Sequence, residues 1–225
     1  MALVGDDGIR AGGGWAWGCS HSMAQLVKFH PTAGGFLPVC VSDDLPTPGV
    51  LANASDSQVI WAAGGNGGGL VSAQLGALVP TDTGWWIAYN AVDGPGCCEA
   101  EGTALQRLDF DGNLDGDLTW VVPAGEGGDP ANHRHPVMAR LGTDADPEVY
   151  VVGYEQPLWS NYRMMLYDGS GTRISTYQAM YSAYGVYWGD RTDSMRTHVD
   201  GDVTWLAMGQ DSDQLRLFRM TWATP

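Results

Sequence analysis

The chain has 225 residues, 44% of them hydrophobic and 10% aromatic, which is enough for one substantial core and short for two independent domains. Its net charge of −15 argues against nucleic acid and anionic membrane surfaces as general partners, because the field of the whole protein would repel them. Membrane insertion is not expected either, since no apolar run approaches the roughly 20 residues of a spanning helix. The 32 glycines fall between apolar runs, as the many turns of an all-β chain require.

A strand rich in aromatic residues, a loop and a second strand with alternating apolar residues recur four times along the chain. The paired segments are 15–18 with 24–29, 85–89 with 104–110, 150–154 with 162–167, and 205–208 with 214–219. A unit of two to four strands cannot bury its own apolar face, so near-copies spaced by roughly 55 to 70 residues predict stacked β-modules. We therefore expect a single all-β domain over residues 1–225, a small β-propeller of four blades built from antiparallel β-meanders.

The segments between the repeats complete this expectation. Further strands are expected at 58–62, 70–79, 118–122, 135–141 and 194–198. The Pro- and Gly-rich residues 45–49 are typical of a connector, and if residues 45–70 form a degenerate blade the ring has five blades. The fourth unit ends at Pro225 one strand short of a blade, which residues 2–9 would complete in a closed ring.

The acidic turn at 109–117 is a candidate cation site. Its oxygen-bearing side chains alternate along the loop, at Asp109, Asp111, Asn113, Asp115 and Asp117. Ca²⁺ takes six to eight oxygen ligands, and alternate residues of a tight loop can aim several of them at one point. From Asp111 the loop reads D-x-N-x-D-G, which resembles the calcium loops of FG-GAP and VCBS propeller repeats. The resemblance implies bound Ca²⁺, whereas the residues alone also fit a metal-free hairpin turn.

Two segments, 115–120 and 200–205, share the pattern Asp-Gly-Asp-x-Thr-Trp. They resemble the Asp-box turn of sialidase-type propellers. That resemblance implies propeller architecture alone, because an Asp-box is a structural turn far from any catalytic centre.

Four cysteines, at positions 19, 40, 97 and 98, predict two disulfides in an exported protein, since their number is even and no Cys-x-x-Cys zinc pattern occurs. Three pairings stay open, among them a bond between the adjacent Cys97 and Cys98 in a glycine-rich loop. The expected location is therefore secreted, periplasmic or at the cell surface. The alternative is a cytosolic protein with free thiols.

One end of the predicted ring gathers the loops that join second and third strands. By strand count, the candidate ligand-binding residues there are His21, Cys97, Cys98, Trp159 and Asp211. An exposed Trp159 beside polar groups would form a platform on which a sugar ring stacks. The alternative is that Trp159 packs on its own blade.

The chain lacks the sequence motifs of serine hydrolases, zinc proteases and phosphate-binding loops, which favours a non-catalytic domain. We expect an exported propeller that binds an extracellular glycan or protein and is stabilised by Ca²⁺. Two other functions are considered: a small propeller glycosidase or lyase with two carboxylates at the central mouth, and a structural surface protein that associates with copies of itself.

Overall fold

The computed structural model describes eleven parts of the chain: residues 24–31, 33–42, 49–52, 58–62, 74–92, 100–121, 134–156, 161–175, 178–180, 195–208 and 215–221. Strands and turns make up these ranges, and no helix occurs in them. The expected all-β class is therefore confirmed. Within the same ranges there is accordingly no helix that is long and apolar enough to cross a membrane.

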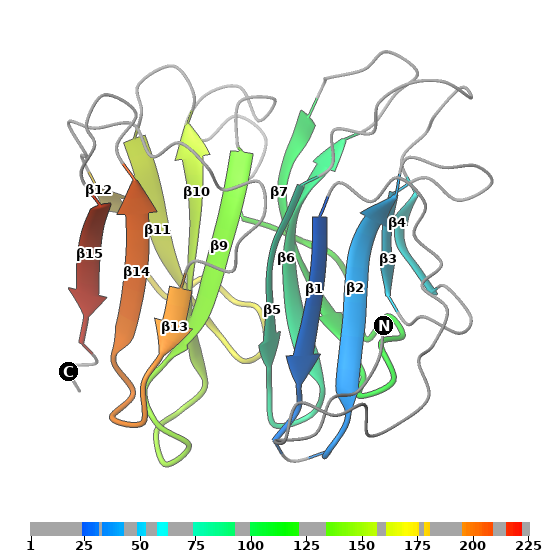
Figure 1. Ribbon diagram of the computed structural model, residues 1–225, viewed down its shortest axis with the longest axis horizontal. Coiled ribbons are helices and arrows are strands. Elements are labelled where there is room, and N and C mark those ends of the chain that lie inside the picture. The colour runs from blue at the N-terminus through cyan, green and yellow to red at the C-terminus, as the bar shows by residue number, and fades with distance from the viewer. Residues whose placement is uncertain are drawn as a thin grey trace, which may run out of the picture.

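The described strands form four antiparallel sheets, each made of consecutive strands in a meander (Figure 1). Sheet 1 contains β1 (Ala24–Phe29), β2 (Phe36–Ser42), β3 (Gly49–Ala52) and β4 (Gln58–Ala62). Sheet 2 contains β5 (Gln74–Pro80), β6 (Trp85–Val92), β7 (Ala100–Leu108) and β8 (Thr119–Trp120). Sheet 3 contains β9 (Arg134–Leu141), β10 (Val149–Gln156), β11 (Asn161–Asp168) and β12 (Gln178–Met180). Sheet 4 contains β13 (Met195–Thr197), β14 (Val203–Met208) and β15 (Leu215–Met220).

Three of the four sequence repeats correspond to the second and third strands of a sheet. These pairs are β6 with β7, β10 with β11, and β14 with β15. The first repeat is laid out differently, because Ala24–Phe29 is the first strand of sheet 1 and pairs with Phe36–Ser42. The sequence did not predict the strand at 36–42, in which Pro38 interrupts the apolar run and offers no N–H group. Residues 15–18, expected as its aromatic partner, lie outside the described residues.

One apolar cluster fills each gap between consecutive sheets. The first joins side chains of sheets 1 and 2, the second those of sheets 2 and 3, and the third those of sheets 3 and 4. Each large apolar side chain removed from water contributes about 1.5–3 kcal/mol before the entropy of ordering the chain is counted. The middle sheets are thus buried on both faces.

The alternation of the second strands explains how one strand serves two clusters. In β6, Trp85 and Tyr89 face sheet 1, whereas Trp86 faces sheet 3. In β10, Tyr150 and Tyr154 face back toward sheet 2. Because the side chains of a strand alternate between its two faces, a strand that is buried on both faces has a nearly continuous run of apolar residues, as β6 does from Trp85 to Tyr89.

The first strands of the four sheets follow one another through the molecule. Strand β5 lies against both β1 and β9, and β9 also lies against β13 (Figure 1). At Gly76 the backbone of β5 comes so close to β9 that a Cβ atom would lie 2.0 Å from the carbonyl oxygen of Pro136. The pairing of β5 with β6 shifts register between Leu75 and Ala77, so Gly76 marks a bulge at this contact.

Consecutive sheets are also tied by polar contacts at the turns between their first and second strands. The His30 ring contacts the turn of sheet 2, at Thr81. The Asp82 N–H group of that turn donates to Glu148 at 2.9 Å, before β10 of sheet 3. The Gly142 N–H group donates to the Gly201 carbonyl of sheet 4 at 2.8 Å. These four turns lie at the lower end of the molecule in Figure 1.

Candidate functional site

A pocket of about 730 Å³ lies where the first strands of the four sheets converge. Its walls come from the ends of β1, β5, β9 and β13 and from the turns that follow these strands. The volume falls within the roughly 300–1,000 Å³ that is typical of small-molecule sites. All four sheets therefore contribute to one concave surface, although their contributions are up to about 170 residues apart in sequence, between Lys28 and Val199.

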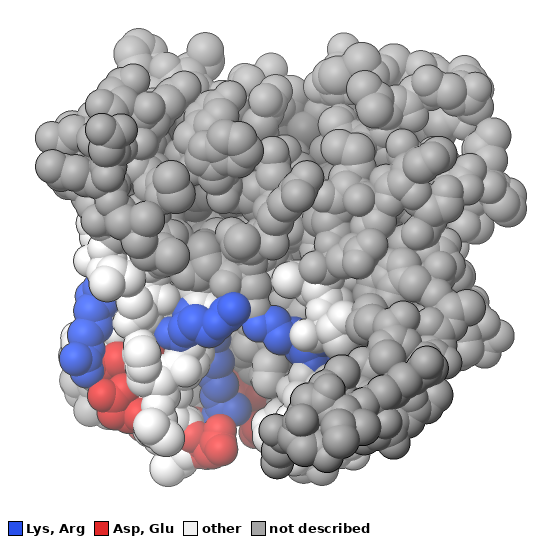
Figure 2. Space-filling model, viewed as in Figure 1, with Lys and Arg blue, Asp and Glu red and all other residues white. Residues whose placement is uncertain are grey.

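The pocket carries an unusual share of the positive charge of this acidic chain. Of the 11 Lys and Arg residues it holds three, including the single lysine: Lys28, Arg140 and Arg196. Figure 2 shows Lys and Arg side chains across the middle of the same view as Figure 1, with Asp and Glu side chains below them. The pocket is thus a local site of positive charge in a protein whose overall field is negative.

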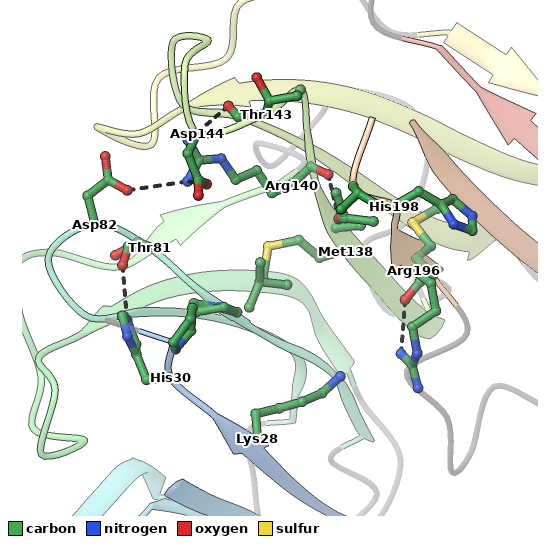
Figure 3. A pocket seen from close by; sticks show the side chains of 18 of the residues that line it. Lys28, His30, Thr81, Asp82, Met138, Arg140, Thr143, Asp144, Arg196 and His198 are labelled. Atoms are coloured by element: carbon green, nitrogen blue, oxygen red, sulfur yellow. Dashed lines mark hydrogen bonds and ion pairs between the residues drawn. The ribbon is translucent and has the colours of Figure 1, made fainter. Parts of the chain in front are cut away.

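Arg140, in β9, connects the two turns that form the rim of the pocket, at 81–84 and 142–146. Its guanidinium lies 3.3 Å from an Asp82 carboxylate oxygen and 3.4 Å from one of Asp144. It also donates to the Thr143 carbonyl oxygen at 3.3 Å (Figure 3). The Arg140 side chain is only 12% exposed, and its Nε has no hydrogen-bond partner in the described part of the chain. Two carboxylates therefore offset the charge of Arg140.

Lys28 and Arg196 bring like charges toward each other from β1 and β13. Both side chains reach into the space between these strands (Figure 3). Burial, and to a smaller extent the charge of Arg196, lower the pKa of Lys28 from its usual 10.5 to about 8. An ammonium group is thus kept partly desolvated near a second cation.

His30 is a structural wall of the pocket. Its Nε2 atom lies 2.9 Å from the carbonyl oxygens of both Thr81 and Gly84, and its Nδ1 accepts the Ala33 N–H at 3.2 Å. These partners assign the ring proton to Nε2, because carbonyl oxygens only accept hydrogen bonds. The ring packs edge-on against Trp85, at a centroid distance of 4.8 Å. His30 therefore orients the first two sheets and is not placed to transfer protons.

The second histidine of the pocket has a different setting. His198 is exposed at the corresponding turn of sheet 4, and its Nε2 lies 2.6 Å from Oγ1 of Thr204. Its backbone closes the turn by accepting the Gly201 N–H at 2.9 Å. The same position in two sheets thus carries a buried histidine in one and an exposed one in the other.

In the 109–117 turn, Asp109 caps the backbone with its carboxylate. One oxygen accepts the N–H groups of Asp111 and Asn113 at 2.9 and 2.8 Å, and the other accepts from the Asn113 amide. Burial opposes ionisation of Asp109, but these hydrogen bonds, led by that of Asn113, hold its pKa below the usual value. Asp115 lies 3.1 Å from Arg107 in an ion pair.

The turn at 168–172 has the same construction without a row of acidic residues. Asp168 accepts the N–H groups of Ser170 and Thr172, both at 2.9 Å. The glycines Gly112 and Gly171 have nearly equal positive φ angles, 87° and 85°. An Asp-capped turn therefore forms here from the backbone and one carboxylate alone. Within the described residues no group of three or more His, Cys, Asp or Glu side chains is arranged to hold a metal ion, so Ca²⁺ at Asp109, Asp111, Asn113, Asp115 and Asp117 stays a prediction.

The candidate ligand-binding residues His21, Cys97, Cys98, Trp159 and Asp211 all lie outside the described residues. Of the four cysteines only Cys40 is described: it is buried in β2 and disulfide-bonded, and its partner belongs to the segments that are not described. A role for Lys28, Arg140 and Arg196 in a site was not predicted, because charged residues inside predicted strands resemble ordinary solvent-facing positions. The one usable signal was that the single lysine of an acidic chain stands within an apolar strand.

Comparison of the chain with protein-family models, with characterised proteins and with solved structures finds no match. The function is therefore inferred from the geometry of the pocket.

Proposed function

We propose that the chain is a small β-propeller domain that binds a ligand, without catalysing a reaction, in the pocket at the convergence of its sheets. The ligand is an extracellular glycan or protein. The observation that carries this proposal is the position of the pocket, which receives residues from the first strand or first turn of every sheet. In a propeller, the innermost strand of each blade faces the central axis, where loops and strand ends build the binding site.

Two features support the propeller architecture. Each apolar cluster joins one sheet to the next in chain order, as in a ring of blades. In addition, Lys28 of sheet 1 and Arg196 of sheet 4 line the same pocket, and the charge of Arg196 contributes to the lowered pKa of Lys28. We infer that sheet 4 adjoins sheet 1 and that the ring closes with four blades.

The carboxylates of the pocket favour binding over catalysis. Glycoside hydrolysis uses two carboxyl groups placed on either side of the bond that is cleaved. Asp82 and Asp144 instead both contact Arg140 at the rim, an arrangement that holds the turns in place. The disulfide at Cys40 supports an exported protein, since disulfides persist mainly in oxidising compartments.

A glycan-array screen, run beside a hydrolysis assay on the same sugars, tests the proposal. We expect binding to particular glycans without release of new reducing ends. Turnover would support the glycosidase or lyase instead. Size-exclusion chromatography with light scattering distinguishes the third function, since a structural protein that associates with itself would elute as a concentration-dependent oligomer.

A further inference from the structure

Three half-exposed phenylalanines gather around the end of the β1–β2 hairpin. The chain has four Phe residues, and three of them are exposed to a similar degree: Phe29 to 49%, Phe36 to 50% and Phe110 to 43%. By contrast, Trp85 and Trp205 are each only 1% exposed. A single exposed apolar side chain is ordinary, but several at one place mark an interaction surface.

Ring contacts connect the three phenylalanines through the hairpin end. Phe29 and Phe36 stand opposite each other in the last pair of β1 and β2, with ring centroids 5.1 Å apart and planes tilted by 57°. The Phe110 ring packs edge-on against His30, at a centroid distance of 4.9 Å. His30 follows Phe29 directly and is fixed by the carbonyl oxygen of Thr81. We call Phe29, Phe36 and Phe110 the aromatic patch.

The hairpin end is uncharged and open to solvent. No Asp, Glu, Lys or Arg occurs between positions 29 and 42. Pro31 and Ala33 are exposed, and a Cβ atom at Gly34 or Gly35 would have no other atom within 4 Å. The hairpin end lies at the lower end of the molecule in Figure 1. A partner can therefore reach the rings of the aromatic patch without displacing atoms of this chain.

The surroundings of the aromatic patch are acidic. The turn that carries Phe110, residues 109–117, contains four Asp and no Lys or Arg. Asp111, next to Phe110, is exposed, and so is Asp82, which follows the Thr81 that contacts His30. With a net charge of −15, two copies of the chain repel each other, and so do the chain and an anionic membrane. The same field attracts a basic partner from a distance.

We propose that the aromatic patch is a docking surface for a basic segment of another protein. An apolar side chain of that segment packs on Phe29 and Phe36, and its Lys or Arg side chains lie near the acidic turn at 109–117. Buried aromatic anchors combined with complementary charge are typical of such interfaces. None of the three phenylalanines lines the pocket, so this inference goes beyond the proposed function and does not depend on it.

Selection of a displayed library of random peptides on the whole chain tests the inference. We expect the enriched peptides to combine Lys or Arg with Leu, Phe or Trp. In anisotropy titrations of the synthesised peptides, Phe29→Ala, Phe36→Ala or Phe110→Ala should weaken binding about 10- to 30-fold, the effect of losing an interface anchor. Leu217→Ala is the matched control, since Leu217 is 70% exposed in β15, and should change the affinity by less than about twofold. Circular dichroism checks that the variants are folded.

The salt dependence of association measures the part played by charge. Between about 0.1 M and 1 M salt the Debye length falls from about 10 Å to about 3 Å. The association rate in stopped-flow mixing should then fall about tenfold or more. Asp111→Asn should slow association at low salt and leave dissociation nearly unchanged. These measurements are made with chelator, so that Ca²⁺ at the 109–117 turn does not contribute.

Four results would overturn the inference. They are a selection that enriches no peptide, enriched peptides without an excess of basic residues, binding that is unchanged by Phe29→Ala, and association that does not respond to salt. A dimer in light scattering that Phe29→Ala abolishes would make a second copy of the chain the occupant instead. None of these results bears on glycan binding in the pocket, which the glycan array measures separately.

Discussion

His30 shows how one side chain can connect two sheets. Its Nδ1 atom accepts one hydrogen bond, and its Nε2–H group donates to two carbonyl oxygens of the neighbouring turn. The residue is almost completely buried. We predict that His30→Ala lowers the free energy of unfolding by about 2–4 kcal/mol, because it leaves a cavity and unsatisfied backbone groups. Urea denaturation measures this. His198→Ala, at the exposed counterpart in sheet 4, is the control and should change stability by about 0.5 kcal/mol or less; equal effects of the two variants would contradict the structural role of His30.

Lys28 should destabilise the fold that contains it. Its pKa is lower in the folded chain than in the unfolded chain, so its charge costs stability below about pH 8, and this cost disappears as the pH rises toward 10.5. We predict that Lys28→Met unfolds at higher denaturant concentration at pH 7, by on the order of 1 kcal/mol once solvent screening of this half-buried group is allowed for. The difference from wild type should shrink between pH 8 and pH 10.5. A variant that is less stable than wild type at pH 7 would contradict the assigned burial.

At the scale of the elements, the two Asp-capped turns allow a test of the calcium prediction. If Asp111, Asn113 and Asp115 bind Ca²⁺, the free energy of unfolding should rise by about 2.7 kcal/mol when free Ca²⁺ is a hundred times its dissociation constant. The double substitution Asp111→Ala with Asp115→Ala should remove that response. Equal melting temperatures with Ca²⁺ and with chelator would show that the turn is metal-free.

The carboxylate of Asp109 has a role that does not depend on metal. We predict that Asp109→Ala costs about 1–3 kcal/mol in the presence of chelator, because three donors of the turn lose their acceptor. Asp111→Ala, two residues away and exposed, is the matched control and should be close to neutral under the same conditions. Because hydrogen bonds hold the pKa of Asp109 below its usual value, its contribution is present near neutral pH and is lost as the pH falls through that lowered pKa. Thermal melts from pH 7 down to pH 2 measure the loss.

The close approach of β5 and β9 makes Gly76 sensitive to any side chain. We predict that Gly76→Ala lowers the free energy of unfolding by about 1–3 kcal/mol, because its Cβ would overlap the Pro136 backbone, which cannot move without disturbing β9. Chemical denaturation of Gly35→Ala is the comparison, since no atom lies within 4 Å of that Cβ position. If both variants are equally stable, the two strands are further apart than described.

The sequence was informative about elements whose pattern is local. The second and third strands of sheets 2, 3 and 4 were predictable because aromatic and apolar residues alternate within a few positions, as in Trp85 to Tyr89. Strand β2 was not predicted, because Pro38 breaks that pattern. The pocket was not predicted either, since its cations stand singly in three strands and only the packing of four sheets brings them together.

At the scale of the whole molecule, the disulfide at Cys40 has a direct test. If the protein is exported and its cysteines are fully paired, thiol titration of unfolded, unreduced protein should find no free thiol among the four. Reduction should lower stability by about 2–4 kcal/mol for each bond that closes a long loop. Two reactive thiols would mean that the bond between Cys40 and its partner is the single disulfide of the chain. Cys97 and Cys98 would then not be bonded to each other.

The three apolar clusters have a consequence for how the molecule opens. Each cluster couples one sheet only to its neighbour in chain order, so within the described residues sheets 2 and 3 have two such partners and sheets 1 and 4 have one. In the proposed ring, the junction between sheets 4 and 1 then lacks an apolar cluster among the described residues, so the ring should open there first. Once it is open, sheets 1 and 4 are the terminal units of an array with nearest-neighbour coupling, and such units are lost before the central ones. Amide hydrogens of β6 and β10 should therefore exchange only through global unfolding. Those of β2 and β14 should exchange through local opening, which requires less free energy.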